Sequence, residues 1–203
     1  MRKLVFIGIC LLASFANAER LLFIPTGDKL RNDQIQFESW ASKGNFKNRI
    51  SFVGIGILDS MDFELRDEYG SFGKNRTSFD FSYNFFVPFP DVSPGISLGV
   101  QDILGNTQDG RSIFLAATWK INQDSPLNAN SPIEVTLGGG TGRYRGAFFG
   151  ARMPFTDGFR LLTEHDSRKL RLGFEIVPLR DLKVLWMTDE QTTSFGANYS
   201  VRF

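Results

Sequence analysis

Hydrophobic and polar residues alternate along most of the chain. The clearest segment is Thr77–Phe86, in which Phe79, Phe81, Tyr83 and Phe85 are separated by single polar residues. Successive side chains of a β-strand point to opposite faces of the sheet. The segment therefore predicts a strand with one aromatic face and one polar face.

The same alternation predicts about twelve strands. Most of them approach the roughly 9–11 residues that a tilted transmembrane strand needs. Two segments, Arg49–Ile57 and Leu182–Thr188, carry apolar residues on both faces. The predicted strands are Gln34–Ser42, Arg49–Ile57, Met61–Arg66, Thr77–Phe86, Ile96–Leu104, Ser112–Ile121, Ile133–Gly138, Arg145–Arg152, Phe159–Asp166, Lys169–Ile176, Leu182–Thr188 and Ser194–Phe203.

The first 18 residues have the pattern of a signal peptide. Arg2 and Lys3 precede the apolar run Leu4–Phe15, and a small-x-small cleavage pattern ends at Ala18. The alternative is an uncleaved anchor, but the run is too short to cross ~30 Å of hydrocarbon as a helix. We expect a signal peptide over residues 1–18, a lead-in segment over 19–33 and one β-domain over 34–203. Within the lead-in, Arg20–Asn32 is either a leading segment or an extra strand.

Composition narrows the fold and excludes one class of partner. The formal net charge is +1, which gives no electrostatic reason to expect nucleic-acid binding. The 21 Phe and 20 Gly favour short strands and tight turns over helices. Cys10, the one cysteine of the sequence, lies in the predicted signal peptide. An exported chain without a disulfide must be stabilised by its core, by closure of a sheet or by a membrane.

Two architectures fit this pattern: a soluble β-sandwich and a closed barrel. The aromatic faces resemble the lipid-facing band of a barrel, and the opposite faces carry charges of both signs. The ending Tyr199, Val201 and Phe203 resembles the assembly signal of bacterial outer-membrane barrels. We expect an all-β fold, a single antiparallel transmembrane β-barrel of about twelve strands in a Gram-negative-type outer membrane. Outer-membrane lipid and the barrel-assembly machinery are then its expected partners.

Strand parity assigns a set of charged side chains to the lumen. Such groups must pair or stay wet, because an isolated buried charge is costly. The structural reading is a salt-bridged interior, and the functional reading is a narrow polar pathway. The lumen-facing candidates are Asp62, Glu64, Arg66, Asp80, Glu134, Lys169, Arg171, Glu175 and Arg202.

Other residues invite chemical readings. His165 is the only histidine and has Ser167 nearby, but a catalytic pair must meet within ~2.6–3.2 Å. The glycine run 138–142 lacks the Lys-Ser/Thr ending of a phosphate loop. Without a Cys or His cluster we predict no transition-metal site, and we predict no catalytic residue and no cofactor. Arg143, Tyr144 and Arg145, near a predicted outer hairpin, offer groups that stack on or hydrogen-bond sugars.

Over about Gly95–Val184 the chain resembles the YjbH-like barrels, a family associated with bacterial exopolysaccharide and capsule production. The matching motifs occur in order: the strand end Gly99–Asn106, the glycine-rich Val135–Gly142, Gly146–Gly150 and the acidic Leu162–Asp166. The resemblance implies an envelope role, with surface polysaccharide or export proteins as further partners.

The sequence thus predicts a non-enzymatic, YjbH-like outer-membrane barrel that assists polysaccharide export or envelope anchoring. Three alternatives remain open at this point. They are a small diffusion pore for polar solutes, a lipid-modifying enzyme that uses His165, and a soluble periplasmic β-sandwich.

Overall fold

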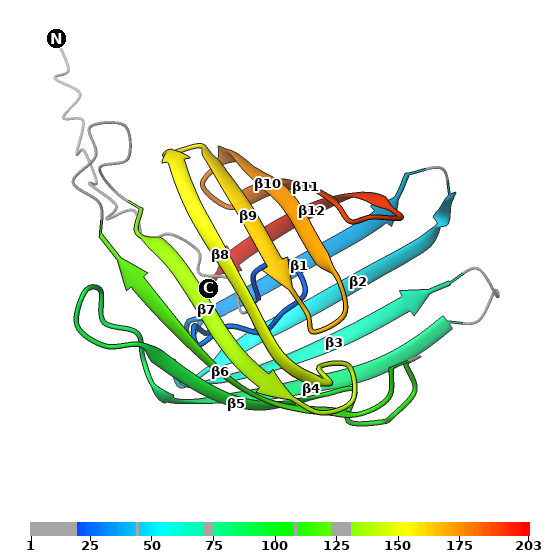
Figure 1. The fold of residues 1–203 in the computed structure, drawn as a ribbon, viewed down its shortest axis with the longest axis horizontal. Helices are drawn as coiled ribbons and strands as arrows, with labels where there is room; N and C mark the ends of the chain where they lie inside the picture. Colours follow the sequence, from blue (N-terminus) through cyan, green and yellow to red (C-terminus); the bar gives the residue numbers. More distant parts are fainter. Residues whose placement is uncertain (1–19, 44, 71–74, 108, 123–130) are drawn as a thin grey trace, which may run out of the picture.

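The computed structural model describes residues 20–43, 45–70, 75–107, 109–122 and 131–203. The predicted signal peptide, residues 1–18, lies outside these residues. The lead-in is described from Arg20 onwards. Twelve strands form one closed antiparallel barrel (Figure 1). The strands are β1 (Gln34–Ser42), β2 (Asn45–Ile57), β3 (Met61–Tyr69), β4 (Asn75–Phe86), β5 (Gly95–Gln101), β6 (Ser112–Ile121), β7 (Ile133–Gly140), β8 (Gly146–Thr156), β9 (Phe159–His165), β10 (Leu170–Leu179), β11 (Leu182–Thr188) and β12 (Thr193–Arg202).

Each strand pairs with its neighbours in the chain, and β12 pairs with β1 to close the barrel. The pairing at this seam runs from Gln34 opposite Arg202 to Ser42 opposite Ser194. Closure removes the unpaired edges that an open sheet would present. The prediction of a single antiparallel barrel of about twelve strands is confirmed.

The strand boundaries differ from the predicted ones where the backbone turns. β5 ends at Gln101 rather than at residue 104, because Asp102 adopts a left-handed conformation with φ of 52°. β8 continues past residue 152 to Thr156, with a register irregularity between Pro154 and Thr156. Pro cannot donate a ladder hydrogen bond, and a bulge accommodates it.

The alternation seen in the sequence separates two surfaces of the barrel wall. Phenylalanines such as Phe63, Phe79, Phe149 and Phe195 point outward and are 44–48 % exposed. Polar residues at the intervening positions, such as Asp80, point inward and are buried. No α-helix that could cross a membrane occurs in the described residues.

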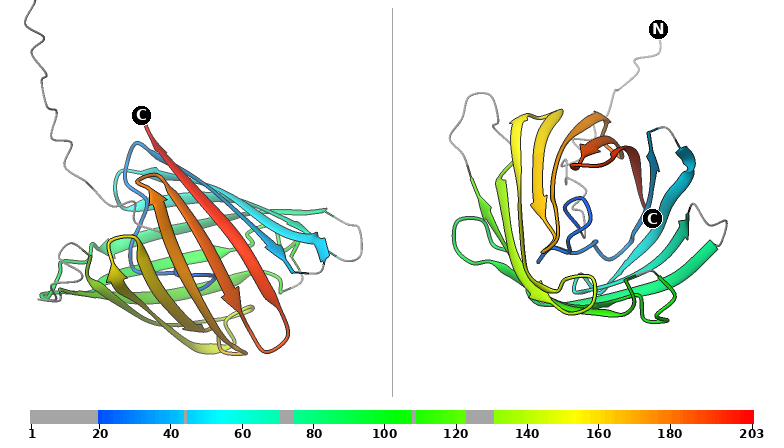
Figure 2. Two further views of the ribbon diagram at one scale, coloured as in Figure 1. Left: turned by 90° about the horizontal axis from the view of Figure 1, so that it is seen from above. Right: turned by 45° about the vertical axis from the view of Figure 1, so that its right-hand side comes forward.

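The part of the lead-in that the structure describes is a leading segment and not an extra strand, and it lies inside the barrel. Residues 20–31 run inside the ring of strands, as the blue segment in Figure 2 shows. Leu22, Ile24 and Leu30 are at most 1 % exposed although they belong to no strand. We call residues 20–31 the internal segment.

Candidate functional site

The internal segment is held at its start by one carboxylate of the wall. The side chain of Glu164, on β9, accepts hydrogen bonds at Oε2 from the N–H groups of Leu22, Phe23 and Ile24, at 3.1, 2.9 and 3.2 Å. Its other oxygen pairs with Arg171, at 2.8 Å. Three convergent N–H groups form a concave site for an anion, and hydrogen bonds to a charged group are the stronger kind. Glu164 is therefore the principal anchor of the turn 21–24.

Ion pairs attach the internal segment to other parts of the wall. Arg20 pairs with Glu64 on β3 at 2.5 Å and with Glu38 on β1 at 3.3 Å. At the other end of the segment, two more pairs join it to β3 and β6: Lys29 with Asp62 at 3.4 Å and Asp28 with Lys120 at 2.5 Å. These buried charges are paired, as the cost of burying an isolated charge requires.

The middle of the segment touches the wall through its backbone. Ser97 and Asn84 donate hydrogen bonds to the carbonyl oxygens of Thr26 and Gly27, at 2.7 and 2.8 Å. A Cβ added at Gly95 would lie 2.2 Å from the Gly27 carbonyl oxygen, and one added at Gly27 would lie 2.1 Å from that of Gly95. Glycine is required at both positions because the two backbones meet directly.

A small hydrophobic core also joins the segment to the wall. The apolar turn 21–24 packs against inward-facing side chains of several strands, among them Trp40, Phe52 and Met187. The rings of Phe23 and Trp40 lie 5.4 Å apart. The sequence predicted a salt-bridged interior. The lumen does contain a charge network, and beside it lies an apolar cluster that the sequence did not predict.

Tyr144 closes this core from the β7–β8 connection. Its hydroxyl lies 2.9 Å from the Phe23 carbonyl oxygen and 2.8 Å from Oε1 of Gln101. Burial raises the pKa of Tyr144 to about 12, so the hydroxyl stays protonated as a donor. Tyr144 is fully buried, which corrects the expectation that it is available to stack on a sugar.

An open cavity of about 350 Å³ lies at one end of the barrel, opposite the end where β1 begins and β12 ends. The internal segment forms the floor of this cavity. We call this cavity the vestibule. Phe23, Trp40 and Met187 contribute its apolar lining. The charged side chains that line it from inward positions are Glu68, Arg76, Arg143, Lys169, Arg171 and Asp189.

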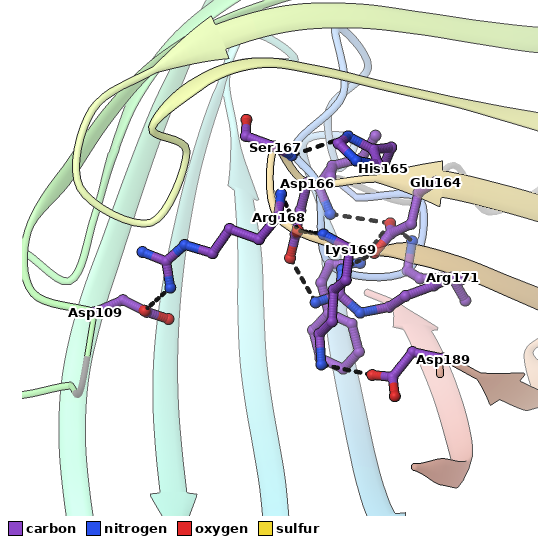
Figure 3. A network of polar contacts seen from close by, with 12 residues as sticks. Asp109, Glu164, His165, Asp166, Ser167, Arg168, Lys169, Arg171 and Asp189 are labelled. Atoms are coloured by element: carbon purple, nitrogen blue, oxygen red, sulfur yellow. Dashed lines mark hydrogen bonds and ion pairs between the residues drawn. The ribbon is translucent and has the colours of Figure 1, made fainter. Parts of the chain in front are cut away.

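An ionic network forms one side of the vestibule (Figure 3). Arg171 pairs with Asp166 at 2.5 Å, and Lys169 pairs with Asp189 at 2.5 Å. Burial raises the pKa of Asp166, but the Arg171 guanidinium and the N–H groups of Lys169 and Arg168 lower it by more. The net pKa lies below the ordinary value of an aspartate, so Asp166 is a carboxylate at neutral pH.

Most of the lumen-facing candidates lie inside the barrel. Asp62, Glu64, Arg66, Asp80, Arg171 and Glu175 are buried, and Glu134 is half-buried and pairs with Arg152 at 2.6 Å. Arg66 pairs with Asp80 at 2.5 Å, and Glu175 pairs with Arg160. Lys169 stands at the vestibule mouth, and Arg202 is exposed at the end of β12. Tyr199, Val201 and Phe203 are exposed on the outer side, and their role as an assembly signal stays a prediction.

The geometry does not place a serine hydroxyl on His165. The His165 ring stacks on Phe149 with centroids 5.3 Å apart, and its Nδ1 accepts a hydrogen bond from the backbone N–H of Ser167. The Ser167 hydroxyl donates instead to the carbonyl oxygen of Ala147, at 2.6 Å. In the glycine run, a Cβ at Gly138 would meet the ring of Phe148, so this glycine makes room for an inward aromatic side chain. Within the described part of the chain no cluster of three His, Cys, Asp or Glu residues is placed to hold a metal ion.

The sequence alone did not reveal the internal segment or its anchor. Two signals could have found them. Residues 21–24 form the apolar run Leu-Leu-Phe-Ile two residues after the predicted signal peptide. The inward parity of Glu164 also places a carboxylate in the lumen rather than at a hairpin tip.

The barrel is similar to that of the KdgM porin. A solved structure titled "KdgM porin" aligns with a TM-score of 0.52 and 9 % identity, over 84 % of this chain and 99 % of that one. A second, titled "KdgM porin in complex with disordered oligogalacturonate", aligns with a TM-score of 0.51 over the same shares. At this identity the likeness shows the fold alone.

Other comparisons add little. The N-terminal β-barrel domain of Pseudomonas aeruginosa OprF aligns with 16 % identity over 84 % of this chain and 98 % of that one, at a TM-score of 0.27. No protein-family model matches the sequence, and no curated protein matches it.

Proposed function

We propose that the chain is a non-enzymatic outer-membrane barrel that forms a channel for polar solutes and is closed, in the state described, by its own internal segment. The outward phenylalanine-rich surface supports a membrane location, because a soluble protein rarely exposes large contiguous apolar patches. With twelve strands, both ends of the strand array lie on one side of the membrane, which in outer-membrane barrels is the periplasmic side. The vestibule then opens at the cell surface.

The observation that carries the proposal is how the lumen is filled. Barrels of eight strands are filled by wall side chains, whereas much larger ones hold a channel. Here the wall presents paired charges, and the remaining space is occupied by residues 20–31, a segment outside the strands. Its contacts with the wall involve side chains and single backbone groups rather than an extended β-ladder. An isolated bridge to a strand, Asn32 with Gly56, comes just after the segment. Release of such a segment would break none of the strand pairings that close the barrel.

Conductance across a planar lipid bilayer tests the proposal. We expect the wild-type protein to be closed most of the time, and a variant lacking residues 20–31 to show long-lived open levels. Heat-dependent migration on a denaturing gel verifies that the truncated barrel has folded. A folded truncated barrel that carries no current would refute the channel.

The YjbH-like role in polysaccharide export or anchoring remains a separate prediction, to which the comparisons do not speak. We favour the channel over this role because the inner wall carries charged side chains and because the element that closes the lumen, the internal segment, belongs to no strand. A surface-polysaccharide defect in a deletion strain that is rescued by a permanently closed barrel would favour the envelope role instead.

A further inference from the structure

The vestibule has an excess of positive charge. Four inward cations line it, and the two inward carboxylates of the lining are Glu68 and Asp189. Lys169 is neutralised by Asp189, and Arg171 by Glu164 and Asp166. The inward excess therefore resides in Arg76 and Arg143, and Arg49, an exposed cation that lies over the Tyr69 ring and also lines the cavity, adds to it.

Arg76 and Arg143 have no carboxylate partner among the residues that the structure describes. Glu68, opposite Arg76 in the β3–β4 ladder, lies 3.6 Å from Arg66. Arg143 instead places its guanidinium 5.6 Å from the centre of the Phe23 ring. A guanidinium that is not used internally is a ready site for a carboxylate or phosphate group, because its planar fork matches both.

The two guanidiniums come from separate parts of the wall. Arg76 is on β4 and Arg143 is in the connection that follows β7, three strand spacings away. At ~4.8 Å per strand this is roughly 14 Å along the wall. Charges spread over that distance suit an extended ligand with several single charges better than one compact phosphate, which needs convergent cations.

The space above the floor leaves room for an extended ligand that reaches both guanidiniums. Phe23 and Trp40 pack side by side under the vestibule and are buried, and the Asp189 carboxylate is already bound to Lys169. The volume of about 350 Å³ falls in the size range of small-molecule sites. The cavity is open at its mouth, so a longer chain can continue outside it.

We infer that the vestibule binds a segment of an acidic oligosaccharide, with the carboxylates of separate sugar units on Arg76 and Arg143. The inference deepens the proposed function and rests on it only in placing the vestibule at the channel mouth. Because the Arg143 guanidinium lies against Phe23, a carboxylate bound to Arg143 would lie next to the internal segment that closes the lumen.

Isothermal titration of the full mature protein in detergent micelles tests the site without any measurement of conductance. The probes are the six-sugar uronates hexagalacturonate and hexamannuronate, the neutral hexasaccharide maltohexaose, and inorganic phosphate. We expect at least one uronate to bind, more weakly as salt rises, and to bind much more tightly than either maltohexaose or phosphate. Arg76→Gln and Arg143→Gln should each lower its affinity roughly tenfold.

Arg145→Gln is the matched control, because Arg145 is an exposed residue of the same connection that does not line the vestibule. It should leave the affinity unchanged. The inference is overturned if neither uronate binds, if maltohexaose or phosphate binds equally well, or if Arg145→Gln weakens binding as much as the vestibule variants. If either vestibule variant fails to fold, the other decides. A barrel that binds the uronate but never conducts would refute the channel and leave the binding site intact.

Discussion

At the scale of single residues, Glu164 connects the wall to the element that fills the lumen. Its two oxygens serve different partners: one receives three backbone N–H groups and the other pairs with Arg171. A single carboxylate thus ties together β9, β10 and the turn 21–24. Loss of its charge would leave Arg171 with only Asp166 and the three N–H groups with a weaker acceptor.

We therefore expect Glu164→Gln to destabilise the protein by roughly 3 kcal/mol, since breaking one partner of a buried ion pair is costly. Urea unfolding in micelles, followed by tryptophan fluorescence, measures this loss. Trp40 is suited to the purpose because it is 3 % exposed and packs on Phe23. The exposed Glu190→Gln is the matched control. An unchanged urea midpoint for Glu164→Gln would contradict the role of Glu164 as an anchor.

Asp166, in the β9–β10 turn, is expected to make the stability of the fold depend on pH. Its pKa is lowered in the folded protein, so the charged form stabilises the fold. This contribution is fully present above the unfolded-state pKa of about 3.9 and is lost as the pH falls through the folded-state pKa. Urea midpoints measured from pH 3 to pH 8 should fall at the acid end for the wild type.

In Asp166→Asn this acid-dependent contribution should be absent, and stability at neutral pH should be lower by about 2 kcal/mol. Asp181→Asn, in an exposed turn, should behave as the wild type does. If Asp166→Asn and the wild type show the same pH profile, the assignment fails.

At the scale of elements, the sequence pattern predicted the strands well and the internal segment poorly. Alternation is a local property of each strand, so twelve periodic segments could be recognised one by one. The position of residues 20–31 depends on contacts with β1, β3, β5, β6 and β9, which no local pattern encodes. Inward parity identified charged wall residues, but not which of them hold the segment.

One anomaly of the sequence acquires a physical explanation at this scale. The segments Arg49–Ile57 and Leu182–Thr188 carry apolar residues on both faces, which an ionic lumen does not explain. Phe52, Leu185 and Met187 are their inward apolar side chains, and all three belong to the core that contains the turn 21–24. Each of these strands is apolar on both faces because one face belongs to the outer surface of the barrel and the other face packs against the internal segment.

The contact between Gly27 and Gly95 provides a way to displace the segment without changing a charge. In Gly95→Ala the new methyl group would overlap the Gly27 carbonyl oxygen and the Pro88 ring, so the contact between the internal segment and this part of the wall must open. Ser97→Cys, placed beneath the segment, reports this opening, because Ser97 is fully buried and donates to Thr26. We expect a water-soluble thiol reagent to label Ser97→Cys slowly, and at least tenfold faster when Gly95→Ala is also present.

Gly158→Ala is the comparison, since an added Cβ there has only one neighbour, at 3.8 Å. It should leave the labelling rate of Ser97→Cys unchanged. Equal labelling of Ser97→Cys with and without Gly95→Ala would show that the glycine contact does not hold the segment in place.

At the scale of the whole molecule, closure of the sheet and the apolar outer surface belong together. In a closed barrel every strand is paired on both sides, so no backbone group of a strand edge is exposed to lipid. The outer side chains then determine whether the barrel is stable in lipid or in water. We expect the folded protein to need detergent or lipid to remain in solution and to migrate differently on a denaturing gel before and after boiling. Phe79→Asp together with Phe149→Asp should reduce recovery in the membrane fraction.

Gln191→Glu, in the exposed β11–β12 turn, adds charge away from the outward strand faces and serves as the control for added charge. Full solubility of the folded wild-type monomer without detergent would contradict the membrane location. These outcomes concern the barrel as a whole and do not depend on the internal segment.

The internal segment also bears on how the barrel assembles. The seam joins residues near position 34 to residues near position 202, contacts that are among the most distant in the chain and therefore among the slowest to form. Before the seam closes, the internal segment can already link the start of the chain to β9 through Glu164. Each such link shortens the loop that the final pairing must close, which lowers its entropic cost. Residues 20–31 would thus act as an inner template for folding, and a chain lacking them should close its seam more slowly even if the finished barrel is the same.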